Sequence, residues 1–262
     1  MDLRLRGKRA IVTGAGVGIG RAIAAELARE GVSVAICARS AETLQAAAKE
    51  IEAETGSRVV PIAADMRDLA DIGRFVDEAA SALGGIDIVV NNAGASVRLS
   101  FAERPDEDWQ DAMLLKFHGY VRVSRAALPH LERAGGGVIL NIIGTGGKVY
   151  TEHHLAGGAS NAALMLVTMG LATELGPQNI RVVAINPGAV LTPRWERSVA
   201  RRAAARGVDP SVINEETARA TPTHRITTAE DVADLAAYLV SDRARQVNGT
   251  IVTIDGGASK AL

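Results

Sequence analysis

The sequence predicts an α/β fold, a seven-stranded parallel sheet that is doubly wound with helices on both faces. Short apolar runs bounded by turn residues alternate along the chain with longer amphipathic stretches. This alternation indicates parallel strands, because a right-handed crossover needs a helix between parallel neighbours. The length of 262 residues suits one large domain, and no stretch has the composition of a linker. We therefore expect a single domain over residues 1–262.

The expected strands are the apolar runs at residues 9–13, 32–38, 59–63, 86–91, 137–143, 180–186 and 250–254. The amphipathic stretches predict helices at residues 18–29, 41–54, 69–83, 106–133, 159–175 and 229–241. Residues 191–227 depart from the alternation, because they are rich in arginine and interrupted by Pro193, Pro210 and Pro222. Long insertions in compact domains are usually functional, and Trp195 gives this one an apolar side chain to bury. We expect it to form a substrate lid.

Composition argues against several classes of partner. The 29 Lys and Arg against 30 Asp and Glu give a net charge of -1, so no overall field favours nucleic acid or an anionic membrane. The single cysteine, Cys37, excludes an intramolecular disulfide and argues against a metal site built on cysteines. No uninterrupted apolar run approaches the roughly 18 residues of a membrane span. We expect a cytoplasmic protein with no metal and no membrane contact.

The first strand leads into a glycine-rich turn at residues 13–20 and then into a helix. Glycine permits positive φ and a close approach of the backbone to a ligand. The free N–H groups that open the following helix attract an anion. In the first strand-to-helix turn of a doubly wound sheet, this pattern predicts a Rossmann fold with a dinucleotide site. The expected cofactor-binding residues are Gly14, Gly16, Gly18, Ile19 and Gly20.

Residues at the ends of later strands indicate which dinucleotide binds. Where an acid usually meets the adenosine ribose, this chain has Arg39, and a guanidinium pairs with a 2′-phosphate. The position favours NADP(H) over NAD(H), unless Arg39 is only a solvated residue at a helix start. Asp65 is placed to accept a hydrogen bond from the adenine amino group. Asn91, Ala93 and Gly94 close the fourth strand where a backbone must pass the nucleotide, so we expect them among the cofactor-binding residues.

Five segments together form a specific pattern: Thr13-Gly14-x-x-x-Gly18-Ile19-Gly20, Asp65, Asn91-Asn92-Ala93-Gly94, Asn186-Pro187-Gly188 with Thr192, and Asp255-Gly256-Gly257. Over essentially its whole length the chain resembles a short-chain dehydrogenase/reductase. The resemblance implies that Asn91 stabilises the central sheet, and that Pro187, Gly188 and Thr192 bracket the nicotinamide. It also implies a small-molecule substrate and assembly as a homodimer or homotetramer.

The chain departs from that family at the catalytic positions. Members use an Asn, a Ser and a Tyr-x-x-x-Lys pair to polarise the substrate oxygen and move its proton. When the family pattern is aligned on Trp109, Gly119 and Asn141, Lys116 stands at the Asn position and Gly144 at the Ser position. Gly157 and Asn161 stand where the Tyr and the Lys belong. Glycine has no side chain that transfers a proton or forms a hydrogen bond. The usual chemistry therefore needs a replacement.

The residues from His154 to Asn161 suggest such a replacement. The chain resembles a divergent subgroup with lysine at the Asn position and the pattern Tyr-x-x-Gly-x-x-x-Asn, in which His154 takes the place of the tyrosine. A histidine three residues before Gly157 faces the same cavity if the helix starts early enough. Our hypothesis is that His154 is the acid/base, that Lys116 assists it by favouring the neutral imidazole, and that Thr145 or Asn161 orients the substrate oxygen.

Several alternatives stay open. His154 is otherwise a loop histidine without a chemical role, Tyr150 is a weaker candidate acid, and Lys116 is otherwise a lysine with its ammonium in water. The arginines Arg98, Arg194, Arg197 and Arg201 either attract an anionic substrate or are simply solvated. Two functions follow from these choices. One is an NADP(H)-dependent oxidoreductase of carbonyls or secondary alcohols with a rearranged site, and the other is an inactive dinucleotide-binding subunit that forms a hetero-oligomer with an active homologue.

Overall fold

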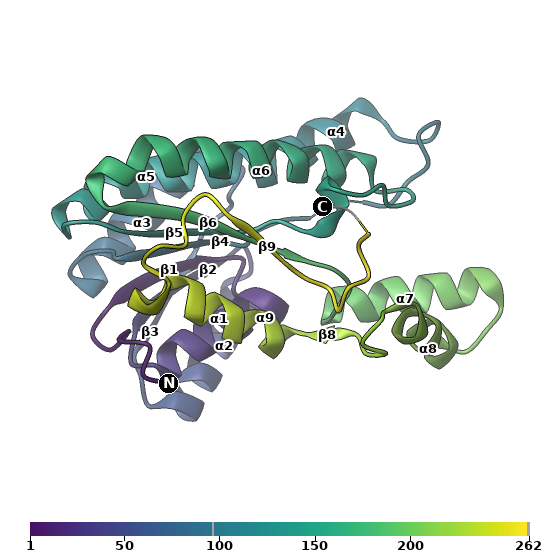
Figure 1. Cartoon of the computed structure of the whole chain (residues 1–262), viewed down its shortest axis with the longest axis horizontal. Helices are drawn as coiled ribbons and strands as arrows, with labels where there is room; N and C mark the ends of the chain where they lie inside the picture. Colours follow the sequence, from purple (N-terminus) through teal and green to yellow (C-terminus); the bar gives the residue numbers. More distant parts are fainter. Residues whose placement is uncertain (96, 261–262) are drawn as a thin grey trace.

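The computed structural model describes residues 1–95 and 97–260. It confirms the predicted sheet of seven parallel strands in the order β3-β2-β1-β4-β5-β6-β9 (Figure 1). The strands are β1 Arg9–Thr13, β2 Ser33–Ala38, β3 Val59–Ala63, β4 Ile88–Asn91, β5 Gly137–Ile142, β6 Ile180–Pro187 and β9 Ile251–Ile254. β1 pairs with both β2 and β4, so the carboxyl ends of β1 and β4 lie side by side. The strand order reverses at this point, and ligands bind there in doubly wound sheets.

Helices cover both faces of the sheet (Figure 1). One face packs against α1 Gly18–Arg29, α2 Ala41–Thr55 and α9 Ala229–Val240. The other packs against α3 Leu69–Leu83, α5 Gly119–Arg133 and part of α6 Leu155–Leu175. Short 3-10 turns lie at η2 Thr145–Gly147, η3 Gly176–Gln178 and η4 Asp242–Ala244. The strands are buried on both faces because each face carries an apolar helix layer.

The predicted helix over residues 106–133 is divided into three parts. α4 Asp106–Ala112 is followed by a π-helical turn, η1 Met113–His118, and then by α5. A π-helical turn inserts an extra residue, which changes the direction of the side chains that follow it, and such turns are frequent at functional sites. Lys116 lies in this turn. Sequence periodicity did not predict the irregularity, because all three parts are helical.

α6 begins at Leu155, four residues before the predicted start at residue 159. The first turn of α6 contains two glycines, which have low helix propensity, so the pattern of apolar residues predicted a later start. His154 is therefore the N-cap of α6, within one turn of Gly157. By length and apolar composition alone, residues 155–178 would also suffice to cross a membrane, but core helices of soluble proteins pass the same test. Here α6 packs against β6.

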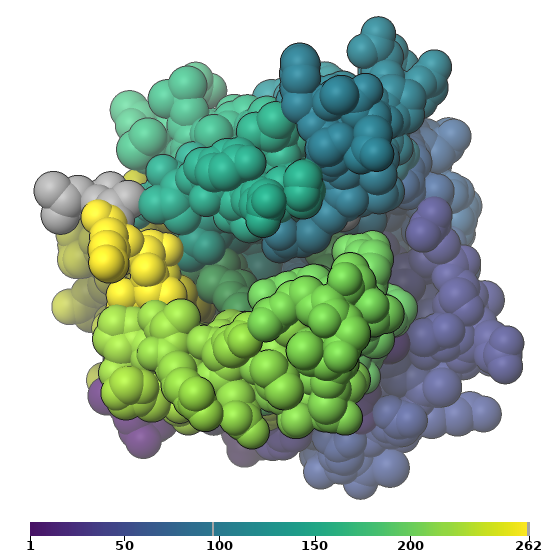
Figure 2. Space-filling model, turned by 90° about the vertical axis from the view of Figure 1, so that its right-hand side faces the viewer, coloured from purple at the N-terminus to yellow at the C-terminus, as the bar shows by residue number. Residues whose placement is uncertain are grey.

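Residues 191–227 contain more regular structure than the prolines suggested. A short two-stranded sheet, β7 Val190–Leu191 with β8 Thr227–Thr228, frames two helices, α7 Pro193–Arg206 and α8 Pro210–Ala220. Pro193 and Pro210 stand at the first helical positions, where the missing N–H is not needed. A small apolar cluster joins the two helices around Val199, Ala203 and Ile213, with Trp195 packed against it. Figure 2 shows their green surface projecting beneath the teal part of the chain, with a recess between them.

Candidate active site

The glycine turn after β1 is packed against the end of β4. Gly14 has a φ of 64°, a left-handed conformation that glycine tolerates best. A Cβ atom on Gly14 would lie 2.8 Å from the Cα of Ala93, and one on Gly20 would lie 2.5 Å from the Nδ2 of Asn92. Side chains at these two positions would collide with the neighbouring segment. Glycine is therefore required for the turn to lie against β4.

Two side chains to which sequence reasoning gave no role, Thr13 and Asn92, hold this turn in place. The amide of Asn92 donates hydrogen bonds to the carbonyl oxygens of Thr13 and Gly14 at 3.1 and 3.0 Å. The hydroxyl of Thr13 accepts from the backbone N–H groups of Asn92 and Ala93 at 2.9 and 3.1 Å. The sequence contains a feature from which both roles could have been predicted: each residue is a polar side chain at the end of a strand, next to a glycine-containing motif.

The start of α1 offers an anion site beside this turn. Its N-cap, Val17, makes no side-chain hydrogen bond, and the first turn holds no acidic residue. The N–H groups of the first helical turn, which includes Ile19, have no intrahelical acceptor, and the helix dipole adds positive potential there. Gly16 and Gly18 border the site without side chains that would fill it. These residues fit the pyrophosphate of a dinucleotide.

Arg39 and Asp65 lie at the ends of β2 and β3, as the sequence predicted. Arg39 is exposed and forms no ion pair with any residue that the structure describes, so its guanidinium is available to a phosphate. Asp65 is partly engaged, because its Oδ1 accepts from the backbone N–H of Arg67 at 3.0 Å and from the Arg67 guanidinium at 3.3 Å. Arg67 also pairs with Asp111. One carboxylate oxygen of Asp65 remains for a ligand.

Asn91 supports the sheet and does not line the open site. Its side chain is fully buried, and its Nδ2 donates to Asn141 Oδ1 and to Ser124 Oγ, each at 3.0 Å. These bonds join β4 to β5 and to α5. Because it is buried, Asn91 positions the end of β4 through these two bonds. Ala93 and Gly94, which follow Asn91 in the same strand-end motif, are partly exposed.

The segment after β6, which contains Gly188 and Thr192, lies next to the glycine turn. β6 ends at Pro187, and a Cβ on Gly188 would lie 2.7 Å from the Cβ of Asp255, so Gly188 fits closely against the end of β9. The hydroxyl of Thr192 accepts from the Trp195 N–H at 3.2 Å and caps α7. The Thr192 methyl lies 3.3 Å from the position of a Cβ on Gly18. Thr192 therefore borders the dinucleotide site from the side of residues 191–227.

Lys116 is directed into the site from the π-helical turn. Its ammonium donates a hydrogen bond to the carbonyl oxygen of Ile143, at the end of β5. Its aliphatic chain passes 3.3 Å from the position of a Cβ on Gly94. Burial, and secondarily the positive charge of Arg194, lower the pKa of Lys116 to about 7. Both protonation states of this lysine are therefore populated near neutral pH.

The imidazole of His154 occupies the space where a side chain on Gly157 would begin. A Cβ on Gly157 would lie 2.2 Å from Cε1 and 2.5 Å from Nε2 of that ring, and a Cβ on Gly146 would lie 3.2 Å from Cδ2. Among the described residues, Nδ1 is buried without a hydrogen-bond partner, which does not hold for Nε2. Burial, followed by the charges of Arg98 and Lys116, lowers the pKa of His154 to about 4. The ring is therefore neutral near pH 7.

The other two predicted catalytic residues differ in their placement. Asn161 lies beside the Ser position, because its Nδ2 donates to the carbonyl oxygen of Gly144 at 3.3 Å. Its Oδ1 is buried and has no hydrogen-bond partner in the part of the chain that the structure describes. Thr145 opens the η2 turn, and its hydroxyl forms no hydrogen bond with any described residue. Gly144 has a φ of 125°, so a serine at that position would be strained. The rival Tyr150 lies in the loop before α6 and is 74% exposed.

A cavity of about 420 Å³ adjoins His154. It is lined by residues 146–151, by Trp109 and by the beginning of α6, including Leu155. His154 is the residue of the predicted catalytic set that lines this cavity, whereas Lys116, Thr145 and Asn161 are not among its lining residues. The cavity combines aromatic and aliphatic walls with the imidazole of His154, which suits the apolar part of a small molecule.

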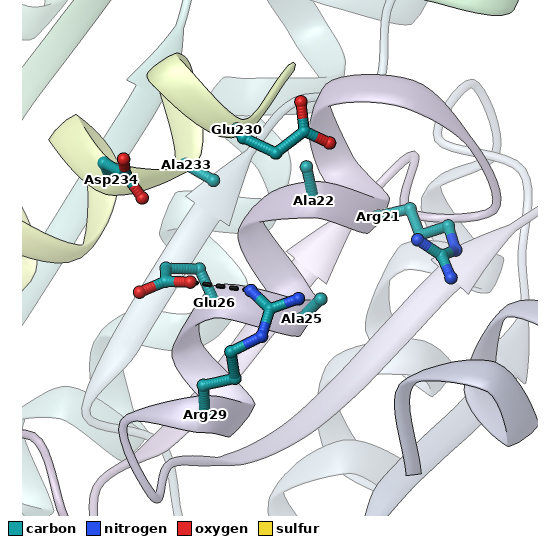
Figure 3. Close-up of a pocket in the computed structure, with 8 residues that line it drawn as sticks. All are labelled: Arg21, Ala22, Ala25, Glu26, Arg29, Glu230, Ala233 and Asp234. Atoms are coloured by element: carbon teal, nitrogen blue, oxygen red, sulfur yellow. Dashed lines mark hydrogen bonds and ion pairs between the residues drawn. The ribbon is translucent and has the colours of Figure 1, made fainter. Parts of the chain in front are cut away.

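A second hollow, of about 40 Å³, lies between α1 and α9 (Figure 3). Figure 3 shows the ion pair of Arg29 with Glu26, 2.7 Å apart, along one side of it, and Asp234 on the facing helix. No residue of the predicted site lines this hollow. Its size is close to that of a single water, so it is a feature of helix packing and not a substrate site.

Comparison with known proteins identifies the family. A model of the family described as short chain dehydrogenase matches residues 8–203. The chain is a short-chain dehydrogenase. Curated relatives agree: it is 33% identical over 252 residues to D-beta-hydroxybutyrate dehydrogenase from Rhizobium meliloti, covering 95% of this chain and 98% of the relative. It is also 33% identical over 261 residues to 7alpha-hydroxysteroid dehydrogenase from Escherichia coli, covering 100% and 98%.

Solved structures resemble this short-chain dehydrogenase over its full length. L-sorbose reductase from Gluconobacter frateurii, complexed with NADPH and L-sorbose, has a TM-score of 0.95 and 34% identity, with 100% of both chains covered. A 7alpha-hydroxysteroid dehydrogenase complexed with NADH has a TM-score of 0.90 and 34% identity, covering 100% of this chain and 98% of that one. Like these relatives, the chain is an oxidoreductase that binds a nicotinamide cofactor and acts on a small molecule.

Proposed function

We propose that this short-chain dehydrogenase transfers hydride between NADP(H) and a carbonyl or secondary alcohol, with His154 in place of the usual tyrosine. The observation that supports this most is the 2.2 Å between His154 Cε1 and the position of a Cβ on Gly157. A tyrosine at position 157 and the imidazole cannot share that volume. The glycine therefore leaves room for another proton-transfer group in its place.

The residues that would hold the cofactor form a continuous surface. Gly16 and Gly18 would face the pyrophosphate together with the start of α1, and Thr192 would lie on the opposite side. Arg39 is free to pair with a 2′-phosphate, which supports a preference for NADP(H). When bound, the nicotinamide supplies or accepts the hydride. Residues 191–227 would act as the substrate lid, since Thr192 and α7 border the same site.

The proton would move through His154. Its neutral ring accepts a proton from an alcohol at Nε2, or returns one to a reduced carbonyl oxygen. Lys116, held at the Ile143 carbonyl, places a positive charge where oxyanion character develops. Asn161 keeps the backbone at Gly144 in position through its hydrogen bond to that carbonyl oxygen. Thr145 has a free hydroxyl that is available to the substrate.

The test separates cofactor binding from chemistry. NADPH oxidation is followed with a panel of ketones and aldehydes for the natural chain, His154→Gln and Tyr150→Phe, and NADPH binding is titrated by its fluorescence. We expect His154→Gln to lower kcat by about 100-fold or more with an unchanged Kd for NADPH, and Tyr150→Phe to retain activity. Equal rates in His154→Gln and the natural chain would contradict the role of His154. Cofactor binding without turnover, restored by a second polypeptide, would instead support the inactive-subunit function.

Assembly as a homodimer or homotetramer is also proposed. Two apolar side chains on α6, Leu166 and Met169, are 69% and 46% exposed. Exposed apolar residues on one helix support a contact with another copy. Light scattering of the purified protein measures the molar mass directly. A monomeric mass at micromolar concentration would contradict this proposal.

A further inference from the structure

Three basic side chains near His154, those of Arg98, Lys116 and Arg194, are held by backbone carbonyls. The guanidinium of Arg98 donates to the carbonyl oxygen of Glu152 at 3.1 Å, and that of Arg194 donates to the carbonyl oxygen of Gly94. Lys116 likewise bonds to a backbone carbonyl. Within residues 1–95 and 97–260, none of these three cations forms an ion pair with an acid. Each of them is held by the neutral oxygen of a backbone carbonyl.

Several arginines elsewhere in the chain pair with acids. Arg9 pairs with Asp87 at 2.8 Å, Arg21 with Glu54 at 2.8 Å, and Arg206 with Glu216. The chain as a whole has a net charge of -1. The unpaired cations around His154 therefore do not follow from an excess of positive charge in the chain as a whole.

Like charges gather there from three separate segments. Arg98 follows β4, Lys116 belongs to η1, and Arg194 begins α7. Burial, followed by the neighbouring Arg202 and Arg201, lowers the pKa of Arg98, and the carboxylate of Glu152 opposes this effect only in part, so the repulsion extends along α7. Bringing cations together without a counter-ion destabilises the folded chain. An anion bound among them would remove that cost.

Arg98 and Arg194 are both exposed on their outer sides, and each uses one guanidinium nitrogen for its carbonyl bond. The remaining N–H groups match the paired oxygens of a carboxylate or phosphate. Arg104 is different, because it is buried and its Nη2 donates to the carbonyl oxygens of Leu99 and His153 at 3.2 and 3.0 Å. Arg104 therefore fixes the loops that carry Arg98 and His154 and is not itself open to a ligand.

We propose that the substrate of this enzyme carries an anionic group, a carboxylate or a phosphate, which binds between Arg98 and Arg194 while the reacting oxygen meets His154. The inference rests on the proposed function, since it concerns the substrate of that same site. A bound anion also offsets the positive charges that act on the imidazole. His154 then holds a proton more readily in the substrate complex than in the free enzyme, which helps it to protonate a reduced carbonyl oxygen.

The experiment compares charged and neutral partners of matched shape. Acetoacetate is tested against methyl acetoacetate, and dihydroxyacetone phosphate against dihydroxyacetone, by kcat/KM with NADPH. We expect the anion to exceed its neutral partner by at least tenfold in one pair, which also distinguishes carboxylate from phosphate. Arg98→Gln and Arg194→Gln should each reduce that ratio by about tenfold, whereas Arg219→Gln, which removes an exposed arginine paired with Glu215, should leave it unchanged.

A second measurement does not depend on turnover. Binding of the same four compounds to the protein saturated with NADP⁺ is measured by calorimetry at low and high salt. Preferential, salt-sensitive binding of an anion supports the inference even if no hydride is transferred, in which case only the proposed function fails. Equal binding of both members of each pair, or an effect of the arginine variants on NADPH affinity alone, would overturn it. The latter result would assign these arginines to the phosphates of the cofactor.

Discussion

The carboxyl edge of the sheet has two halves that are built in different ways. At the ends of β1 and β4, the glycine turn is locked by the hydrogen bonds of Thr13 and Asn92, and added Cβ atoms would meet backbone. Near the ends of β5 and β6, the atoms nearest to a Cβ on Gly157 belong to the side chain of His154, and the nearby cations bond to backbone carbonyls. In the first half, close contacts and hydrogen bonds fix the backbone of the glycine turn. In the second half, a side chain can be replaced without a collision with backbone. The catalytic residues can therefore change while the cofactor-binding turn at the same edge of the sheet is retained.

The largest expected effect is a disruption of the rigid half by Gly20→Ala. The new Cβ would lie 2.5 Å from both Asn92 Nδ2 and the Gly14 carbonyl oxygen, which are held by the turn itself. We expect a loss of about 3 kcal/mol in the free energy of unfolding, measured with urea, and a weaker Kd for NADPH. Gly73→Ala on α3 is the control, because nothing lies within 4 Å of its Cβ position. An equally mild effect at both sites would show that the turn is not rigid.

The next effect concerns the adaptable half, through Gly157→Ala. Its Cβ would overlap the imidazole of His154, which can rotate away because it is a side chain. We expect stability to change by less than about 1 kcal/mol while kcat/KM falls by about 100-fold, since the proton-transfer group is displaced. Gly170→Ala in the same helix has nothing within 4 Å of its Cβ and should retain activity. Full activity in Gly157→Ala would mean that the position of His154 is not important.

A smaller effect is expected from reversing a charge on the cofactor side. Arg39→Glu removes the free guanidinium at the end of β2 and introduces a carboxylate that repels a 2′-phosphate. We expect the Kd for NADPH to rise about tenfold, with little change for NADH, in fluorescence titrations. Arg245→Glu is the matched control, because Arg245 is exposed and lies beyond η4. An unchanged ratio of the two affinities would make Arg39 a solvated residue only.

The sequence predicted the sheet well because each buried strand is a short apolar run with clear turn residues at its ends. The seven strands differ from their predicted bounds by two residues or fewer. It predicted α7 and α8 poorly, since prolines can begin a helix as well as interrupt one. The π-helical turn at Lys116 was also missed, because its residues have ordinary helical composition and only tertiary packing distinguishes it.

The candidate site shows a similar division. The motifs placed the glycine turn, Arg39 and Thr192 at one edge of the sheet because strand ends of a parallel sheet meet there. Asn91 was grouped with the cofactor residues, although its burial makes it a support of the sheet. The overlap of His154 with the space above Gly157 depends on where α6 begins, and spacing in sequence did not fix that residue. Contacts between distant segments, such as Arg194 with Gly94, carry no local signal at all.

The smallest expected effect is a pH dependence of stability that belongs to His154. Its pKa falls from 6.5 to about 4 on folding, mainly because the ring is buried and secondarily because cations surround it. Between these values the unfolded chain binds more protons, so the free energy of unfolding decreases as the pH falls through this window. Between pH 7 and pH 4.5, we expect the natural chain to lose about 1 kcal/mol more than His154→Gln in urea unfolding. His224→Gln changes an exposed histidine and should follow the natural chain. Parallel curves for the natural chain and His154→Gln would mean that the imidazole is not held among the cations, and the adaptable half would then lack its proposed proton carrier.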